Sequence, residues 1–305
     1  MSLPLSSPLP PASRPALVTR LRAAGCVFAE DEARLLLATA RTPSDLAAMT
    51  DRRVAGHPLE QVLGWAEFCG LRITVDPGVF VPRRRTEFLV GQAAALVRAR
   101  TAVHPRPVVV DLCCGTGAVG TALAAAAGTD PSGAPGANGS PGASGTSGAF
   151  GAPASPSPIE LHAADIEPAA VRCARRNIPP ATGRVYEGDL YAPLPRSLRG
   201  RVDILVVNAP YVPTEAIGLL PPEARDHEPR VALDGGTDGL DVQRRVAAGT
   251  LRWLAPGGHL LIETSERQAP RTLEALRRNG LATRLATDDD LGATVAIGTA
   301  PAASP

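Results

Sequence analysis

The sequence predicts a doubly wound α/β fold, in which a sheet of seven strands lies between helices, preceded by a small helical domain. Residues 83–299 alternate apolar, strand-like runs with helix-like segments, the pattern of a mostly parallel sheet with helical connections. Residues 15–64 instead show only helical spacing of apolar residues. The strands are predicted near 107–112, 159–164, 183–187, 202–207, 258–264, 281–287 and 293–299.

The N-terminal elements follow from local patterns. Residues 1–14 are predicted to be disordered, and helices are expected over 15–64, with Thr42-Pro43 and His57-Pro58 as breaks. Short apolar runs and the turn signal Asp76-Pro77-Gly78 predict a hairpin connector over 65–82. A helix after Arg83 then leads into the main domain, and residues 300–305 are expected to form a tail.

Composition excludes several classes of protein. The 305 residues are 44% apolar, enough for one large and one small core, and the net charge of +1 disfavours nonspecific nucleic-acid binding. Five cysteines without a CxxC pair fit reduced thiols, and no metal site is expected. With no signal segment and no run near ~20 apolar residues, we expect a cytoplasmic protein without a membrane span.

A low-complexity segment interrupts the main domain. Of the 30 residues from 129 to 158, 25 are Gly, Ala, Pro or Ser, a composition that buries too little apolar surface to order itself. We predict a disordered insertion. Lengthening a loop from ~4 to ~30 residues costs only roughly 2 kcal/mol, so the fold tolerates it.

The first strand of the main domain leads into a glycine turn. Cys113-Cys114-Gly115-Thr116-Gly117 follows the strand and opens an Ala-rich helix, which is typical of a nucleoside-cofactor cradle. The turn also fits the G-x-G-x-x-G pattern, so a hydride-transferring dehydrogenase is the alternative. Asp111 attracts the ammonium and sulfonium of S-adenosylmethionine and repels a pyrophosphate, which favours methyl transfer.

Two further acids follow predicted strands. Asp165 comes 50 residues after Gly115, and subtracting the insertion restores the ~20 expected of a nucleoside-binding unit, so we predict that it binds the ribose hydroxyls. Its alternative role is a helix cap before Glu167-Pro168. Asp189 is predicted to accept from the adenine amine and Leu190 to pack on the ring, with an ordinary solvated turn as the alternative.

The cysteines of the glycine turn allow two interpretations. Cys113 and Cys114 could be redox or nucleophilic residues, but no His or base motif accompanies them. We therefore interpret them as small packing residues.

Asn208-Ala209-Pro210-Tyr211 ends the apolar run 202–207, and this combination suits a site that grips a planar amide. The Asn208 side-chain oxygen and the Ala209 carbonyl are predicted to accept the two N–H bonds, and Pro210 biases Ala209 toward the extended region. Tyr211 is predicted to stack on the acceptor, with a core tyrosine as the alternative.

The two motifs together resemble the class I S-adenosylmethionine-dependent methyltransferases that act on a planar nitrogen, and in particular the protein-(glutamine-N5) methyltransferase family of the HemK/PrmC type. Segments 52–59, 79–87, 227–233 and 257–263 match the family's order, and the resemblance covers roughly residues 50–299 apart from the insertion. It implies a Rossmann-like methyltransferase domain over 83–299 and a substrate-recognising helical domain over 15–64.

The resemblance also implies the chemistry. The cofactor is S-adenosylmethionine, and the acceptor is a protein glutamine in the Gly-Gly-Gln loop of peptide chain release factor. Pro82 and Thr86 are implied as lining residues near the methionine end of the cofactor.

Departures from the family pattern mark a divergent branch. Cys113 stands at a usual glycine, Ala209 at a usual proline and Arg85 at a usual acid. Residues 83–85 fit a solvated helix start as well as they fit a family segment that packs over the cofactor. Glu228 is interpreted either as fixing the acceptor loop or as a surface charge, and His227 as structural.

Two other functions are compatible with the motifs. The first is an adenine-amine methyltransferase acting on DNA or RNA, because an adenine amine presents the same planar N–H pair to such a loop. The near-neutral charge and the lack of a basic stripe disfavour it. A cofactor-binding scaffold is disfavoured by Asn208 and Tyr211. We therefore predict an enzyme with a protein acceptor and no nucleic-acid substrate.

Overall fold

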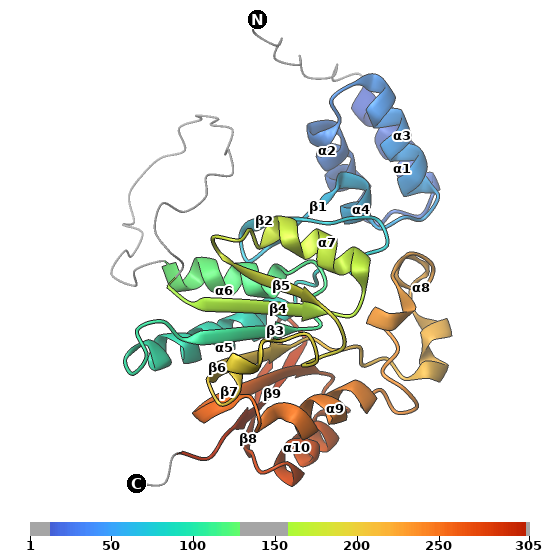
Figure 1. The fold of residues 1–305 in the computed structure, drawn as a ribbon. Helices are drawn as coiled ribbons and strands as arrows, with labels where there is room; N and C mark the ends of the chain where they lie inside the picture. The colour runs from blue at the N-terminus through green and yellow to red at the C-terminus, as the bar shows by residue number, and fades with distance from the viewer. Residues whose placement is uncertain (1–12, 129–157, 303–305) are drawn as a thin grey trace, which may run out of the picture.

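The computed structural model describes residues 13–128 and 158–302 (Figure 1). Nearly all of the insertion predicted to be disordered, most of the predicted N-terminal segment and half of the predicted C-terminal tail lie outside these ranges. The first helix begins at Ser13, two residues inside the stretch predicted to be disordered. Ala300 was assigned to the tail but is buried, because it pairs with the backbone of Gly258 and packs in the core.

The N-terminal helices form a cluster with its own apolar core. Leu21, Ala33 and Leu36 are fully buried there, in agreement with the helical spacing of the sequence. The third helix starts with Pro at its first turn, and the Thr42 hydroxyl caps it by accepting from Asp45 N at 3.0 Å. The helices are α1 (Ser13–Ala23), α2 (Ala29–Thr39), α3 (Pro43–Val54) and α4 (Leu59–Leu63).

A hairpin and a long helix connect this cluster to the sheet. Strands β1 (Trp65–Phe68) and β2 (Leu71–Thr74) pair antiparallel as predicted, and α5 (Thr86–Thr101) follows. Asn177 ties the hairpin to the main domain, because its amide bonds to both backbone groups of Thr74 at 2.9 Å and to Thr116 O at 2.8 Å.

The main sheet has seven strands in the order β5-β4-β3-β6-β7-β9-β8, which confirms the predicted doubly wound sheet. Strands β4, β3, β6 and β7 run parallel, as does β5 at one edge, whereas β9 is antiparallel to both of its neighbours. The strands are β3 (Val108–Leu112), β4 (Glu160–Asp165), β5 (Gly183–Glu187), β6 (Val202–Val207), β7 (Leu254–Thr264), β8 (Ala282–Asp288) and β9 (Ala293–Thr299).

Each face of the sheet has its own core. Val109, Ile204 and Val206 belong to the core shared with α5, α6 (Ala118–Gly128) and α7 (Pro168–Asn177). Val110 and Leu205 belong to the opposite core, which includes residues of α9 (Asp241–Thr250) and α10 (Ala269–Arg278). Burial on both faces therefore explains why the central strands β3 and β6 are almost entirely apolar, with one buried aspartate in each.

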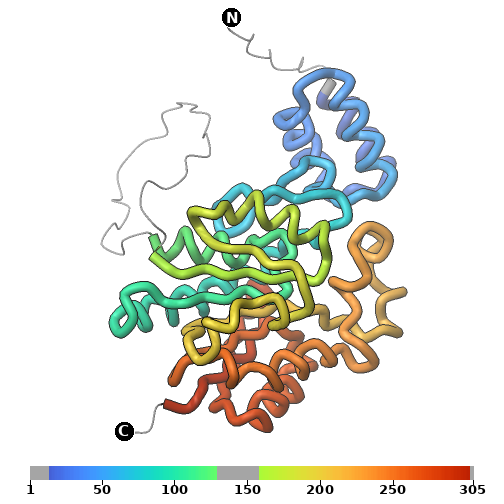
Figure 2. The backbone as a smooth tube through the Cα atoms, in the orientation of Figure 1, coloured from blue at the N-terminus to red at the C-terminus, as the bar shows by residue number. Residues whose placement is uncertain are grey.

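The chain between β6 and α9 leaves the sheet and reaches the helical cluster (Figure 2). It contains η2 (Thr214–Leu219), α8 (Pro222–His227) and η3 (Arg230–Ala232). The His57 and His227 rings lie 4.1 Å apart, centroid to centroid, and Gln61 Nε2 donates to His227 O at 3.4 Å. His227 therefore has a structural contact in this part of the fold.

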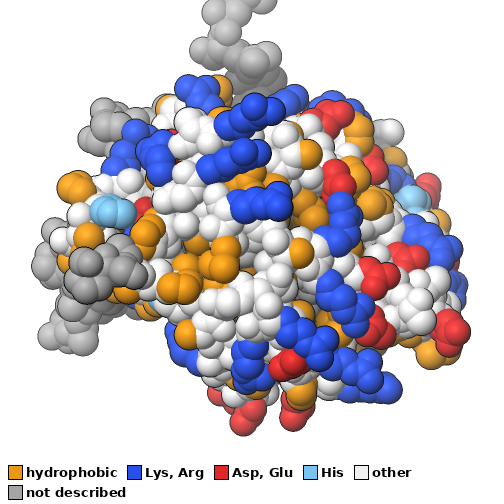
Figure 3. All heavy atoms as spheres, turned by 60° about the horizontal axis from the view of Figure 1, so that its bottom comes forward, with side chains coloured by type: hydrophobic (Ala, Val, Ile, Leu, Met, Phe, Trp, Pro, Cys, Tyr) orange, Lys and Arg blue, Asp and Glu red, His pale blue; other side chains and the backbone are white. Residues whose placement is uncertain are grey.

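Charged groups are mixed over the surface. Figure 3 shows basic side chains spread over one face with acidic side chains among them. Several form local pairs, such as Arg278 with Glu274 at 2.8 Å. Within the described ranges, no helix has the length and apolar character needed to cross a membrane.

Arg53 forms a buried ion pair within the helical cluster and also contacts α8. Arg53 contacts both carboxylate oxygens of Glu32, at 2.7 and 3.0 Å, and also Glu223 Oε1 of α8 at 2.7 Å. The Arg53 and Glu32 side chains are only 8% and 9% exposed. Removing one partner of a buried pair leaves an uncompensated charge, so the position is sensitive to substitution.

We expect Arg53→Met to lower the free energy of unfolding by about 3 kcal/mol, because Glu32 stays buried without its partner. The matched control is Arg20→Met, which removes an exposed pair with Asp51 and should cost at most about 1 kcal/mol. Urea denaturation followed by circular dichroism measures both values. Equal losses for the two variants would contradict the role given to Arg53.

Candidate functional site

A cavity of about 850 Å³ opens at the carboxyl edge of the parallel strands. This is where ligands bind in open α/β sheets, at the point where the chain winds off in both directions from β3. With one exception, every residue predicted for the site lines this cavity: Pro82, Thr86, Asp111, Cys113, Cys114, Gly115, Thr116, Asp165, Asp189, Leu190, Asn208, Ala209, Pro210 and Tyr211.

The exception is Gly117, which packs against Ala174 and Ile178 of the α7 region. It has a φ of +75°, and a Cβ there would lie 2.9 Å from Ile178 Cδ1 and 3.2 Å from Ala174 Cβ. Gly117 is therefore required for close packing of the turn against α7 and is not among the residues that line the cavity.

The glycine turn is fixed to the neighbouring strand. Asp165 Oδ2 accepts from Gly115 N at 2.8 Å, and its Oδ1 accepts from Glu167 N at 2.9 Å. The cap of α7 is Glu167, whose carboxylate accepts from Ala169 N, so the alternative of Asp165 as the cap is wrong. Asp165 thus shapes the turn and faces the cavity at once.

Asp111 is a buried acid beside the turn. It is 2% exposed, and its Oδ2 accepts from Gly120 N at 2.9 Å near the start of α6. Burial raises the pKa of this carboxyl to about 7, against the lowering effect of the Gly120 hydrogen bond. Between described residues this carboxyl has no ion pair, so it suits a positively charged ligand group.

Cys113 and Cys114 act as packing residues, as interpreted from the sequence. Burial raises the pKa of both thiols, which keeps them protonated and poorly nucleophilic. Cys113 has a φ of +56°, in the left-handed region that favours glycine, which is the usual residue of the resembled family at this position. Holding a non-glycine residue there costs roughly 1–2 kcal/mol.

Asp189 and Leu190, predicted to contact the adenine, follow β5 and line the cavity. Leu190 also has a left-handed backbone, with a φ of +48°. Asp189 forms an ion pair with Arg245 of α9, and both side chains are about half exposed and line the cavity. Arg245 carried no local sequence signal, because its partner lies 56 residues away.

The acceptor loop begins where β6 ends. Asn208 is half-buried, and its Nδ2 donates to Thr86 Oγ1 at 3.4 Å. Ala209 and Pro210 are buried, whereas the half-buried Tyr211 borders the cavity. Thr86 uses one N–H of Nδ2, and Oδ1 is the atom of this amide that can accept from a ligand.

Two of the three arginines at the start of α5, Arg83 and Arg85, form ion pairs, whereas Arg84 is exposed. Arg85 donates to the Tyr211 hydroxyl, and its Nε lies 3.3 Å from Glu263 Oε1. Burial raises the pKa of Tyr211 to about 12, so its hydroxyl is neutral near pH 7. Burial also raises the pKa of Glu263, an effect opposed by the Thr86 hydroxyl and the Arg85 guanidinium.

Glu228 is buried, so its interpretation as a surface charge is wrong. Its Oε1 accepts from Val81 N at 3.1 Å and from Arg83 at 2.6 Å. This pair joins the segment before α5 to the loop after β6, which are 145 residues apart. The pairing of Arg83 with Glu228 therefore supports the role of Glu228 in fixing the acceptor loop.

The described residues contain no group of three or more His, Cys, Asp or Glu side chains able to hold a metal ion. The fold is that of a class I methyltransferase, and the glycine turn after β3, the end of β4 and the polar loop after β6 open on one cavity. This defines the class of the protein.

Known proteins place the chain more narrowly. A release factor glutamine methyltransferase of Streptomyces coelicolor is 36% identical over 217 residues, covering 71% of this chain and 66% of that protein. One from Geobacter sulfurreducens is 34% identical over 261 residues, covering 84% and 78%. No protein-family model matches the sequence. The chain belongs to the release factor glutamine methyltransferase family.

One relative carries a different name. A 4-amino-L-phenylalanine/4-methylamino-L-phenylalanine methyltransferase of Streptomyces pristinaespiralis is 34% identical over 235 residues, covering 75% of this chain and 71% of that protein. Its name specifies an aryl amine as acceptor.

The raised pKa of Asp111 leads to a prediction for cofactor binding. The carboxyl is neutral below about pH 7 and charged above it, and only the charged form attracts an ammonium group. We expect the affinity for S-adenosylhomocysteine to rise roughly tenfold between pH 6 and pH 8, one pKa unit being worth a factor of ten. Titration calorimetry across this range measures it.

Asp111→Asn is the matched control, since it keeps the shape and removes the titration. Its affinity should be low and nearly independent of pH over the same range. A wild-type affinity that does not change with pH would show that Asp111 does not hold the ammonium.

Proposed function

We propose that this protein transfers the methyl group of S-adenosylmethionine to the side-chain amide nitrogen of a protein glutamine. The observation that carries the proposal is the position of Asn208. It lies at the end of β6, in the same cavity as Gly115 and Asp165, with its Nδ2 donating to Thr86. In this proposal the side-chain oxygen of Asn208 accepts from the amide of the acceptor.

The residues of the cavity suit the cofactor. In this proposal Asp111 faces the ammonium, Asp165 the ribose hydroxyls, and Asp189 and Leu190 the adenine, as the sequence predicts. The neighbouring wall formed by Pro82 and Thr86 receives the methionine end. When bound, the cofactor supplies an electrophilic methyl group on a sulfonium, so the protein itself needs only to bind and orient.

Orientation matters because an amide nitrogen is a weak nucleophile, its lone pair being delocalised into the carbonyl. In this proposal Asn208 Oδ1 and the Ala209 carbonyl each accept one of the two N–H bonds, which leaves the lone pair facing the methyl group. Well-oriented reactants recover roughly 7–11 kcal/mol of barrier, far more than one hydrogen bond supplies.

Tyr211 supplies a flat surface for the acceptor. Arg85 donates to its hydroxyl, and Tyr211 lines the cavity. Tyr211 is therefore not an ordinary core tyrosine. The neutral phenol stacks on the planar amide in this account and takes no part in proton transfer. Arg85 replaces an acid that is usual in the resembled family, and here it positions this ring.

The names of the relatives support release factor as the protein acceptor. A second candidate is a free aryl amine, which the Streptomyces pristinaespiralis relative favours by its name. Aryl amines and glutamine amides both offer a planar NH2 group to Asn208.

The proposal is tested by incubating the enzyme with labelled S-adenosylmethionine and, separately, release factor, 4-amino-L-phenylalanine, DNA or RNA. Mass spectrometry then locates the label. We expect methylation of the glutamine of the Gly-Gly-Gln loop, with no label on nucleic acid. Label only on the amino acid or only on adenine would overturn the assigned acceptor.

Asn208→Ala should lower turnover on the order of a hundredfold, because a preorganised polar group at the reacting atom is lost. Affinity for S-adenosylhomocysteine should change much less. Asn279→Ala is the matched control: Asn279 is also a half-buried asparagine, bonded to Ala275 O at 2.8 Å, but it lies at the end of α10, outside the cavity lining. Equal turnover for the two variants would remove Asn208 from the mechanism.

A further inference from the structure

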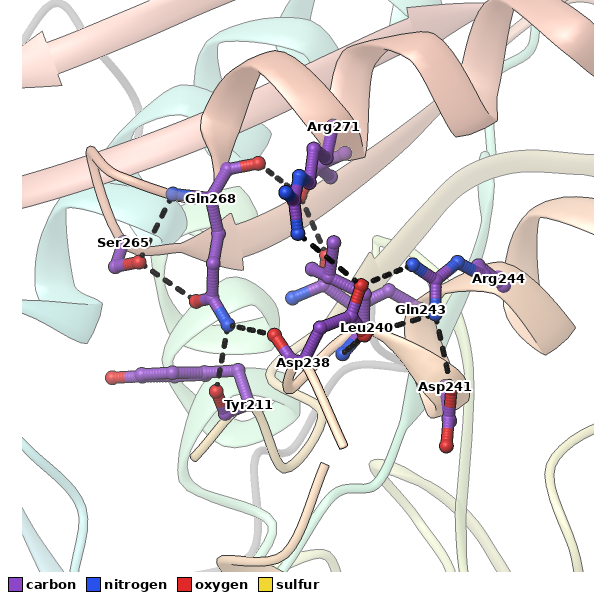
Figure 4. Close-up of polar contacts among 10 residues, drawn as sticks. Tyr211, Asp238, Leu240, Asp241, Gln243, Arg244, Ser265, Gln268 and Arg271 are labelled. Atoms are coloured by element: carbon purple, nitrogen blue, oxygen red, sulfur yellow. Dashed lines mark hydrogen bonds and ion pairs between the residues drawn. The ribbon is translucent and has the colours of Figure 1, made fainter. Parts of the chain in front are cut away.

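Gln268 is a buried amide that no sequence motif singled out. It precedes α10 and is 9% exposed. Its Nε2 donates to two backbone carbonyls, Tyr211 O at 2.9 Å and Asp238 O at 3.0 Å (Figure 4). One side chain thereby uses both of its N–H bonds to hold the end of the acceptor loop against the segment before α9.

Ser265 fixes the orientation of this amide. Its Oγ donates to Gln268 Oε1 at 2.7 Å. The same Ser265 Oγ accepts from the backbone N of Gln268 at 3.3 Å (Figure 4). A flipped amide would turn its oxygen toward two carbonyl oxygens and lose both hydrogen bonds. Ser265 itself lines the cavity.

Gly239 allows the two backbone segments to meet. A Cβ at this residue would lie 2.2 Å from Tyr211 O and 2.3 Å from Gln268 Nε2, and its φ is +79°. Any side chain here would therefore displace either the Tyr211 carbonyl or the amide that holds it.

The residue after Tyr211 continues the same attachment. Val212 N donates to Leu233 O at 3.0 Å, and Gly235 N donates to Val212 O at 2.8 Å. Upstream, Asn208 is held by Thr86. The acceptor loop is thus fixed at both ends, and Gln268 holds the backbone carbonyl of Tyr211.

We propose that Gln268 is a positioning residue of the acceptor site. By clamping the Tyr211 carbonyl it fixes the backbone from which the Tyr211 ring projects, and so the surface on which the acceptor stacks. This inference rests on the proposed role of Tyr211. The clamp acts on the acceptor side of the cavity, so its loss reduces turnover more than cofactor affinity.

A matched residue separates positioning from general packing. Gln243 is also a buried amide, 1% exposed, and its Oε1 accepts from Thr272 Oγ1 at 2.8 Å. Gln243 lies in α9, and none of its hydrogen bonds between described residues reaches Tyr211. Gln243→Leu and Gln268→Leu are thus the same change at two buried sites, of which one holds the loop.

The test compares these variants in the full chain with release factor as acceptor. We expect Gln268→Leu to lower kcat on the order of tenfold to a hundredfold relative to Gln243→Leu, since small displacements of reacting groups have effects of this size. The affinity for S-adenosylhomocysteine should stay within about threefold. Gln268→Glu, which has the same shape but places oxygen against both carbonyls, should lose kcat similarly.

Hydrogen exchange without acceptor gives a second, independent measurement. Gln268→Leu should speed exchange at the amides of Val212 and Thr214, which bond to Leu233 O and Gly236 O, and Gln243→Leu should not. Unchanged exchange, or a kcat within twofold of the Gln243 variant, would overturn the proposal. If the wild-type enzyme methylates no glutamine, the proposed function fails while the exchange comparison still decides whether the clamp exists.

Discussion

The site depends on the pairing of one central strand with two parallel neighbours. Strand β3 pairs with β4 on one side and β6 on the other, with Asp111 opposite Ala163 and Val206 in the two registers. The ends of all three strands therefore meet at one edge of the sheet. The cofactor turn, Asp165 and Asn208 are brought together by this arrangement although they span almost a hundred residues of sequence, with the insertion between them.

Local patterns were sufficient for the fold and for the residues at strand ends. The central strands β3 and β6 are buried, mostly apolar and short, so their positions follow from composition, and each polar residue directly after a parallel strand falls at the same edge. The supporting residues were missed for the opposite reason. Arg83 with Glu228, Arg85 with Glu263 and Gln268 with Tyr211 are pairs formed only by the tertiary fold, and no local spacing announces them. A useful signal for Glu263 was its place near the end of β7, the same position that identified Asp165 and Asn208 on their strands.

Two residues that line the cavity have strained backbone conformations, and contacts from neighbouring elements hold the surrounding loops. Cys113 and Leu190 both adopt left-handed backbone conformations on the cofactor side, where such strain is tolerated only if surrounding contacts hold it. On the acceptor side, buried charges and amides fix a loop that has little regular structure of its own. The helical cluster shares in this restraint, because Arg53 contacts Glu223 and His57 packs on His227 in the segment that follows the acceptor loop. The loop that lines the cavity thus depends on contacts from outside the sheet.

The central claim is that a methyl donor in the glycine-turn cradle faces a planar NH2 group held by Asn208. A crystal structure of the enzyme with S-adenosylhomocysteine and a glutamine-containing peptide tests it most directly. The account predicts the glutamine nitrogen within hydrogen-bonding distance of Asn208 Oδ1 and the Ala209 carbonyl, in line with the cofactor sulfur, and stacked on Tyr211. A glutamine bound elsewhere, or a cofactor sulfur directed away from Asn208, would contradict it.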